Sequence, residues 1–427
     1  MVKLLYVVID GLPDRVEDKT TLDVSDTPGL DMIAKMGICG LMYTVGKGYA
    51  PESDVAVLSI LSYNPETSYT GRGPLEAVGV GLDFKEGFEV AFRANFATID
   101  EDTLEVIDRR VGRTLKNEEA RELAKTLTGM DLGVKGAYVK VVSTIGHRAV
   151  VVLGYKSRLS DNITNTDPAY VRKGRISVAI NKREKLKISP CKPLDDTVEA
   201  KITARLVNRF TERSIDILKH HPVNIMREQK GMLKANAILL RDPGTCKPKV
   251  KPLTLKFGLK FAAIAEMPVE IGIARVLGMK VEVVDVKGLG RRELLKHELK
   301  LTTKLLKDND VVYVHLKGPD EPGHDGDLEG KVREVELIDR LYIQPLLDMV
   351  SIDDTMILVT SDHATPWTMR THTDDPVPIA IAWSGIKPDA VNKFSERECF
   401  KGDLGIIEHG WELLPKVVHM LRGRERS

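Results

Sequence analysis

The chain has few cysteines, and none of them has the paired spacing of a metal or redox motif. Cys39, Cys191, Cys246 and Cys399 are the four cysteines of 427 residues, and they lie far apart without any C-x-x-C pair. Such spacing is typical of reduced thiols in a cytosolic protein and argues against a disulfide framework. We therefore expect a cytoplasmic protein that depends on its hydrophobic core for stability.

The chain also lacks an excess of charge of either sign. Its 63 basic and 62 acidic side chains give a formal net charge of +1, and no stripe of basic and aromatic residues stands out. Binding to nucleic acid is therefore not expected. Long apolar runs are missing too, since the apolar start at residues 4–9 is too short for a signal segment and ends in an acid. The sequence predicts a soluble protein without a membrane partner.

An α/β pattern is present in two blocks of the chain. Residues 3–9 are expected to form a buried parallel strand, followed by helices at 28–36 and 54–62. From about residue 257 the pattern returns, with helical runs between apolar segments that are typical of strands: 261–265, 281–286, 311–316, 356–360 and 378–383. A chain of this length with 42% hydrophobic residues is large enough for two domains.

Between these blocks the pattern changes to short strands with alternating polarity. We expect strands and one long helix there: 90–96, 137–142 and 149–153, then 195–219. We interpret residues 85–245 as a smaller inserted α+β domain. Residues 1–84 and 246–427 would then form one core domain with a doubly wound sheet. The breaker-rich segment 241–252 is expected to be a hinge or linker.

Carboxylates and imidazoles cluster in two short runs near the C-terminus. Asp320 and His324 enclose Glu-Pro-Gly, which predicts a tight turn and not one helical face. Asp362 and His363 are adjacent, so they can serve two cations about 3.5 to 4 Å apart, and His372 would complete one ligand set. Mixed carboxylate and imidazole ligands without thiolate suit manganese, magnesium, cobalt or zinc, of which manganese is our first choice.

Two residues from the start of the chain extend this cluster. Asp10 follows an apolar strand, as Asp320 and Asp362 do, and open parallel sheets place their ligand crevice at such strand ends. Ser53 begins a predicted helix, where backbone N–H groups and the helix dipole stabilise an alkoxide or a phosphate. Taken alone, Ser53 would be an ordinary helix-capping serine, but beside the metal motifs it becomes a candidate nucleophile. His315 lies inside a strand and is expected to support the site or to pack in the core.

Several cations of the inserted segment lie next to turn residues. Guanidinium groups can clamp a phosphate or a carboxylate with two hydrogen bonds, although a single arginine is more often solvated or half of an ion pair. The candidate substrate-binding residues are Arg110, Arg113, His147, Arg148, Asp167 and Arg241.

These residues resemble those of the cofactor-independent phosphoglycerate mutases of archaeal type, which belong to the alkaline phosphatase superfamily. The resemblance runs nearly end to end and rests on several motifs: Asp10-Gly11, Ser53-Asp54, 71–77, 108–113, 320–325, and Ser361-Asp362-His363 with His372. It implies an alkaline-phosphatase-like α/β core that carries the metals and the nucleophile. It also implies that the inserted domain is a substrate-binding lid.

The resemblance also assigns roles to the candidate residues. One metal would be held by Asp320, His324 and His372, and the other by Asp10, Ser53, Asp362 and His363. Ser53 would be the phosphorylated residue. His147 would be an acid/base or a phosphate contact, Asp167 would orient glycerate hydroxyls, and four arginines would bind anions: Arg110, Arg113, Arg148 and Arg241.

The implied activity is an isomerisation in glycolysis and gluconeogenesis. 3-Phosphoglycerate and 2-phosphoglycerate would interconvert through a phosphoserine, with two divalent metals and without 2,3-bisphosphoglycerate. The same residues would also suit a metal-dependent phosphomonoesterase or another phosphomutase, because fold alone does not decide the reaction. A non-enzymatic alternative is a binding protein in which the metals only stabilise the core. The sequence favours no oligomeric state.

Overall fold

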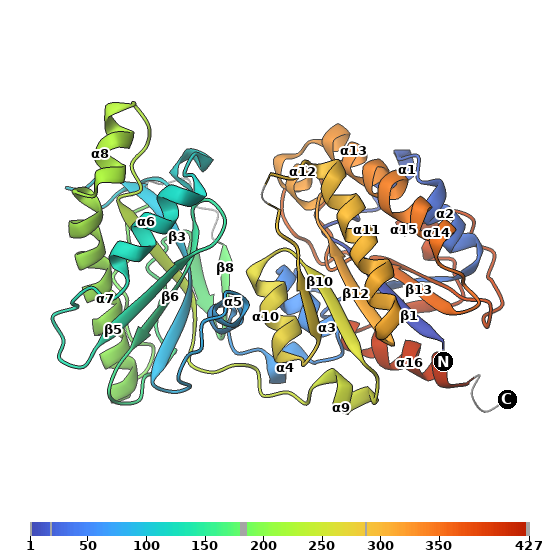
Figure 1. The fold of residues 1–427 in the computed structure, drawn as a ribbon, viewed down its shortest axis with the longest axis horizontal. Coiled ribbons are helices and arrows are strands. Elements are labelled where there is room, and N and C mark those ends of the chain that lie inside the picture. Colours follow the sequence, from blue (N-terminus) through green and yellow to red (C-terminus); the bar gives the residue numbers. More distant parts are fainter. Residues whose placement is uncertain (1, 18, 180–185, 287, 424–427) are drawn as a thin grey trace. The chain divides into compact units, whose positions relative to one another are not determined.

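The structure is a computed structural model that describes residues 2–17, 19–179, 186–286 and 288–423. The chain divides into two compact units (Figure 1). The first unit contains Met1–Tyr69 and Val250–Ser427, and the second contains Thr70–Lys249. The sequence predicts the first boundary of the core domain after residue 84, whereas this division places it after Tyr69. The reason is that helix α5 (Arg72–Gly79) packs against strands of the second unit and buries Ala77 there.

The first unit is built on a mixed eight-stranded sheet. Its described strands follow the order β11 (Lys280–Val283), β10 (Phe261–Ala265), β12 (Val311–Leu316), β1 (Lys3–Ile9), β13 (Thr355–Thr360), β14 (Val377–Ala382), β2 (Gly37–Met42) and β15 (Gly405–Ile407). All neighbours are parallel except β14, which runs antiparallel to β13 and to β2. The central strands are continuous apolar runs because both of their faces are buried.

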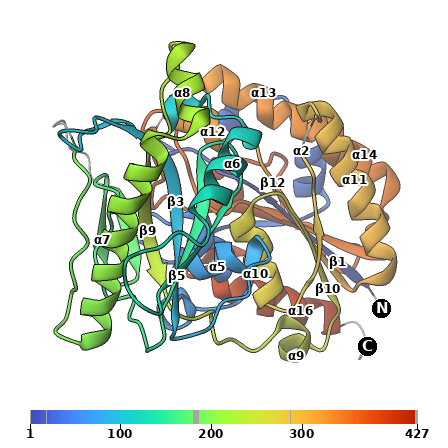
Figure 2. The ribbon, with the colours of Figure 1, turned by 60° about the vertical axis from the view of Figure 1, so that its left-hand side comes forward.

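Helices cover both faces of this sheet. Leu5, Val7 and Ile9 of β1 face a core built with α2 (Pro28–Lys35), α11 (Arg291–Asp308), α13 (Leu328–Ile338) and α14 (Gln344–Met349) (Figure 2). Tyr6 points the other way, and its hydroxyl donates to the carbonyl of Ile60 in α3 (Ser53–Ile60). The remaining helices of this unit include α1 (Thr21–Val24), α4 (Pro65–Ser68), α9 (Leu253–Phe257), α10 (Pro268–Val276), α12 (Asp320–Asp325), α15 (Glu396–Cys399) and α16 (Leu413–Gly423).

The second unit is an antiparallel sheet with helices. Strands β4 (Val106–Asp108), β3 (Glu89–Ile99), β6 (Arg148–Gly154) and β5 (Tyr138–Ser143) follow one another, and β9 (Ala237–Gly244) also pairs with β3. Its apolar core is shared with α6 (Asn117–Leu127) and α7 (Val198–Lys219). Helix α8 (Pro222–Gln229) and the hairpin of β7 (Tyr170–Lys173) and β8 (Ile176–Ala179) complete the described elements. The expected fold class, an α/β core with an α+β insertion, is confirmed.

The structure corrects two local expectations. Asp320 and His324 do not lie on a tight turn but on one face of α12, because Pro322 occupies the first turn of a helix, where a missing N–H leaves no acceptor unpaired. Residues 241–244 are not linker but the end of β9, where the ladder with β3 shifts by one residue. Such a bulge accommodates the positive φ of Asp242 and the proline that follows it.

Two further observations concern the described residues as a whole. None of the helices in the described ranges combines the length and the apolar character that a bilayer crossing requires. The four cysteines are free, and Cys39, Cys191 and Cys399 are buried.

Candidate active site

Three acids of the first unit lie at one edge of its sheet. Strand β1 is the parallel neighbour of both β12 and β13, with Ile9 opposite Leu316 and Val8 opposite Thr360. The carboxyl ends of these strands therefore meet, and the residues that follow them converge. Asp10 comes directly after β1, Asp362 is the second residue after β13, and Asp320 opens α12 four residues after β12.

Asp10, Asp362 and His363 form a first group of possible metal ligands. The His363 Nε2 atom lies 3.4 Å from Asp10 Oδ1 and 3.3 Å from Asp362 Oδ2. These two oxygens are buried and have no hydrogen-bond partner among the described residues. Burial raises the pKa of Asp10 to about 7 although Lys317 opposes the shift. Two buried carboxylate oxygens that face a ring nitrogen need a cation between them, so the donor set fits a divalent metal.

Asp320, His324 and His372 form a second group. Asp320 Oδ1 lies 3.5 Å from the Nε2 atoms of both histidines, and those two nitrogens are 3.2 Å apart. Burial disfavours the cation of His372, but its hydrogen bond to Asp320 and the negative charges of Glu52, Asp320 and Asp362 together outweigh burial and raise its pKa to about 10. A proton therefore occupies this point when no metal does, and a bound cation would displace it. Asp320, His363 and His372 also lie within ligand distance of one another, so His363 borders both groups.

The opposite ring nitrogens fix the orientation of all three imidazoles. The Nδ1 atoms of His372 and His324 lie 2.8 Å and 3.2 Å from the carbonyls of Pro51 and Arg370, which can only accept. His363 Nδ1 lies 3.0 Å from the Thr365 hydroxyl, which itself donates to Asp320. Each Nδ1 is therefore the donor, and each Nε2 faces the carboxylates, where its lone pair is available to a cation that displaces the proton, as in metal sites.

Ser53 is the first residue of α3, and its side chain reaches the first group. Its Oγ atom lies 3.0 Å from His363 Nε2. The N-terminal turn of α3 places backbone N–H groups and the positive end of the helix dipole beside this hydroxyl. The structure thus brings together Ser53 and all six acids and histidines that the sequence suggested as metal ligands.

A buried layer behind the first group was not anticipated from the sequence, apart from His315. Lys317 Nζ lies 3.0 Å from Asp10 Oδ2 and also contacts Glu270 Oε1. His315 lies between Glu270 and Asp362, at 3.5 Å from each. A lysine directly after an apolar strand, beside the predicted metal motif, is a signal that could have revealed Lys317.

The second unit gathers arginines on neighbouring strands. Arg93 of β3 pairs in register with Arg241 of β9, and Arg72 bonds Glu76 over 2.7 Å. Glu76 also lies 3.8 Å from Arg93. Burial and the neighbouring Arg241 and Arg72 lower the pKa of Arg93 to about 9. The positive charges outnumber the acid between them, so this cluster can bind an anion.

The other suggested residues of the second unit surround His147 and Asp167. Burial, with Arg148, Arg110 and further arginines, lowers the pKa of His147 to about 4. Arg113 belongs to the same surroundings and has a positive φ of 56°. Asp167 is buried, and its main partner is a residue missed from the sequence, Arg109, which bonds both carboxylate oxygens.

Arg241 also approaches Asp167, and its guanidinium group lies over the ring of Tyr170. Its Nη1 atom is 4.0 Å from the Asp167 carboxylate, and the ring centroid is 3.8 Å from the guanidinium carbon. The stacking holds the planar group in a fixed orientation. Asp167 is thus held by arginines on two sides.

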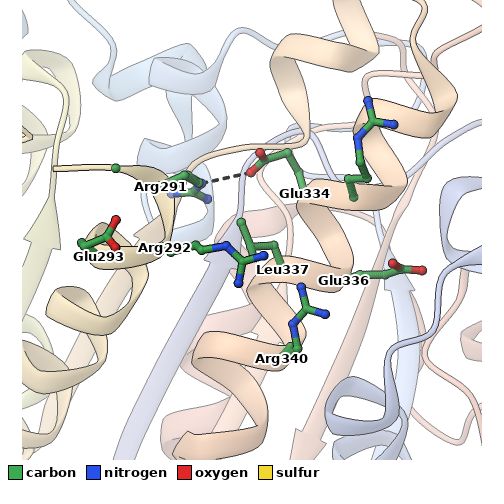
Figure 3. A pocket seen from close by; sticks show the side chains of 9 residues that line it. Arg291, Arg292, Glu293, Glu334, Glu336, Leu337 and Arg340 are labelled. Carbon is green, nitrogen blue, oxygen red and sulfur yellow. Dashed lines mark hydrogen bonds and ion pairs between the residues drawn. The ribbon is translucent and has the colours of Figure 1, made fainter.

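A surface pocket of the first unit lies away from both ligand groups. It has a volume of about 470 Å³ (Figure 3). Its lining comes from Gly290 and the start of α11, from α13, and from Arg340 in the helical segment Asp339–Ile343 that continues α13. Arg291 bonds Glu334 over 3.0 Å at its edge, and Arg292 and Arg340 extend beside Leu337. None of its lining residues belongs to either ligand group, so we do not assign the chemistry to it.

Comparisons with known proteins agree with the geometry. Residues 34–224 match the family model of the 2,3-bisphosphoglycerate-independent phosphoglycerate mutases. A protein of that name from Aeropyrum pernix is 47% identical over 427 residues, covering 99% of this chain and 100% of that protein. One from Archaeoglobus fulgidus is 40% identical, covering 98% of each. The solved cofactor-independent phosphoglycerate mutase from Thermoplasma acidophilum has a TM-score of 0.61 at 30% identity, covering 97% of this chain and 100% of that one.

Proposed function

We propose a mechanism from the premise that the chain belongs to the 2,3-bisphosphoglycerate-independent phosphoglycerate mutases, which are isomerases. It interconverts 3-phosphoglycerate and 2-phosphoglycerate, and Ser53 carries the phosphoryl group between the two hydroxyls. The observation that carries the proposal is the position of the Ser53 hydroxyl, 3.0 Å from His363 Nε2 at the start of α3.

The two ligand groups each take one divalent cation. Asp320, His324 and His372 hold one of them. Asp10, Ser53, Asp362 and His363 hold the other. Bound there, the cations would lower the pKa of the serine hydroxyl and neutralise the phosphoryl oxygens. The oxygen and nitrogen donors fit manganese first, and magnesium, cobalt or zinc as well.

The chain's own residues then move the phosphoryl group in two steps. Ser53 Oγ loses its proton and forms a bond to phosphorus while the bond to the 3-oxygen of the substrate breaks, and that oxygen takes up the released proton. The 2-hydroxyl of the retained glycerate then loses its proton and attacks the phosphoserine, and the freed Ser53 oxygen takes up that proton. The N-terminal dipole of α3 stabilises the charge on both occasions. Because the substrate itself donates the group, 2,3-bisphosphoglycerate is not required.

The second unit binds the anionic groups of the substrate. Arg110, Arg113, Arg148 and Arg241, which the sequence suggested, act with Arg72 and Arg93 on the carboxylate and phosphate. His147 stays neutral among these arginines and serves as a phosphate contact or an acid/base. Asp167 keeps its proposed place at the glycerate hydroxyls through its bonds to Arg109. This binding keeps glycerate in place between the two transfers.

A phosphomonoesterase with the same residues is the rival, and product analysis separates the two. With 3-phosphoglycerate and manganese, we expect 2-phosphoglycerate to form much faster than inorganic phosphate. Ser53→Ala should lower turnover by at least about 10³-fold, because the nucleophile is lost. Ser59→Ala, a buried serine of the same helix, is the matched control and should keep most of the activity. Full activity of Ser53→Ala would refute the covalent route, and phosphate release without mutase product would establish the rival.

A further inference from the structure

Glu270 is a buried carboxylate behind the first ligand group that the proposed mechanism does not use. It is the third residue of α10 and is 3% exposed. His315 and Lys317 are separated by one residue at the end of β12, so both side chains point to the same face of the sheet, toward α10. Both contact the same oxygen, Glu270 Oε1.

Each of these two residues reaches a carboxylate of the ligand group on its other side. Lys317 Nζ lies 3.0 Å from Asp10 Oδ2, and His315 Nε2 lies 3.5 Å from Asp362 Oδ2. The oxygens that face His363 are the other Asp10 oxygen and the same Asp362 oxygen. One buried glutamate is therefore connected to two acids of the ligand group by two separate branches.

The charges indicate what Glu270 does. A divalent cation at this group is balanced by the two negative charges of Asp10 and Asp362. Lys317 adds a positive charge beside Asp10 that would repel the cation unless another acid balances it. Besides Asp10, Glu270 is the acid in contact with that ammonium group. Both side chains are largely withdrawn from water, so their charges interact strongly.

We propose that Glu270 is a positioning residue of the metal site: it holds Lys317 and His315 against Asp10 and Asp362 and cancels the charge of Lys317. The inference rests on the proposed function, because it assumes that the Asp10 group binds a cation. It makes a prediction that packing alone does not make. Removing Glu270 and removing Lys317 should change the affinity for the cation in opposite directions.

The test is a titration of the full-length, metal-stripped protein with Mn²⁺ in competition with a fluorescent chelator. Glu270→Gln keeps the shape of the side chain and should weaken the affected binding step by about 10- to 100-fold, the usual effect of losing such a partner. Lys317→Met should bind Mn²⁺ more tightly than the unaltered protein. The double variant should return to within about threefold of it, because both charges are gone.

The affected step is assigned in a second background. His324→Asn removes a donor of the other ligand group, so a change that persists there belongs to the Asp10 group. The proposal is overturned if Glu270→Gln leaves the affinity unchanged, or if both single variants weaken it equally. If Glu270→Gln does not fold, Lys317→Met alone decides, since weaker binding contradicts the proposal. An unaltered protein that binds no Mn²⁺ would overturn the proposed function as well, which distinguishes the two failures.

Discussion

The hydroxyl of Thr365 donates a hydrogen bond of 2.7 Å to Asp320 Oδ1. The Thr365 hydroxyl oxygen also lies 3.0 Å from His363 Nδ1, and Thr365 is buried. One hydroxyl thus orients a carboxylate of the second ligand group and an imidazole that borders both groups. The geometry of both proposed cation sites therefore depends on a residue that is not itself a ligand.

Thr365→Val should separate this orienting role from packing. Valine has nearly the same shape but cannot hold either partner, so we expect Mn²⁺ affinity and mutase turnover to fall about 10- to 100-fold. Thr365→Ser should keep most of both. The matched control is Thr360→Val. Among the described residues the Thr360 hydroxyl bonds only the Pro378 carbonyl, so this substitution should lower the free energy of unfolding by about 1 kcal/mol. Equal effects of Thr365→Val and Thr360→Val would contradict the orienting role.

Removing the metal should destabilise the protein. Without a cation, the buried oxygens of Asp10 and Asp362 face the site unpaired. We expect a chelator to lower the melting temperature and Mn²⁺ to restore it. At a Mn²⁺ concentration of 100 times the dissociation constant, binding should raise the free energy of unfolding by about 2.7 kcal/mol. Calorimetry at several Mn²⁺ concentrations measures this, and Asp10→Asn should reduce the response. A melting temperature that ignores both chelator and Mn²⁺ would argue against a bound cation.

The arginine cluster of the second unit should affect substrate binding and not metal binding. Arg93 is partly buried beside Arg72, Arg241 and Glu76, so Arg93→Leu removes a cation that is close to the proposed anion site. We expect KM for 3-phosphoglycerate to rise about 10- to 100-fold, as for a lost charged hydrogen bond, with unchanged Mn²⁺ affinity. Arg121→Leu, an exposed arginine of α6 paired with Glu118, is the control. Kinetics that match the control would remove Arg93 from the substrate site.

His147 should remain neutral through the physiological range. Burial and the surrounding arginines lower its pKa to about 4, against about 6.5 in an unfolded chain. Between these values the unfolded state binds more protons, so this group's contribution to stability is complete above pH 6.5 and is lost as pH falls toward 4. NMR of labelled histidine, assigned with His147→Asn, should show a midpoint near 4 that rises when phosphate binds. A midpoint near 6.5 without phosphate would contradict this environment.

The convergence of the proposed metal ligands could be predicted from the sequence because the sheet brings these residues together. Asp10 and Asp362 follow apolar runs, and parallel neighbours β1 and β13 must end at the same edge. Convergence of these acids therefore follows from the secondary structure alone. The helical turn from Asp320 to His324 was not predicted, because a proline between two candidate ligands suggests a break, although it is tolerated in a first helical turn.

The partners of these ligands could not be predicted, because they depend on tertiary contacts. Glu270 reaches the ligand group only because α10 packs against β10, the sheet neighbour of β12, and no spacing in the sequence connects Glu270 with Lys317. Arg93 alternates along β3 with core residues such as Phe92 and Ala94, so it is indistinguishable from an exposed arginine until the register with β9 is known. The antiparallel direction of β14 is equally invisible, since its residues are a plain apolar run.

A buried ion pair joins the loops that carry the ligands, and it supports a prediction about stability. Lys331 Nζ lies 2.7 Å from Asp14 Oδ1 and also donates to the carbonyls of Pro13 and Thr365. Burial lowers the pKa of Lys331, and Asp14 opposes the shift. The pair thus ties the loop after β1 to the loop after β13, with α13 as the anchor.

Lys331→Met should lower the free energy of unfolding by about 3 to 5 kcal/mol, because it leaves the Asp14 carboxylate buried without its cation. Asp14 also accepts bonds from the backbone N–H groups of Thr21 and Trp367, which an asparagine oxygen can still accept in part. The double variant Asp14→Asn/Lys331→Met therefore removes the charge and should recover most of the loss. Urea unfolding of the three proteins measures it. A double variant no more stable than Lys331→Met would show that packing of the lysine stem, and not the unpaired charge, sets the cost.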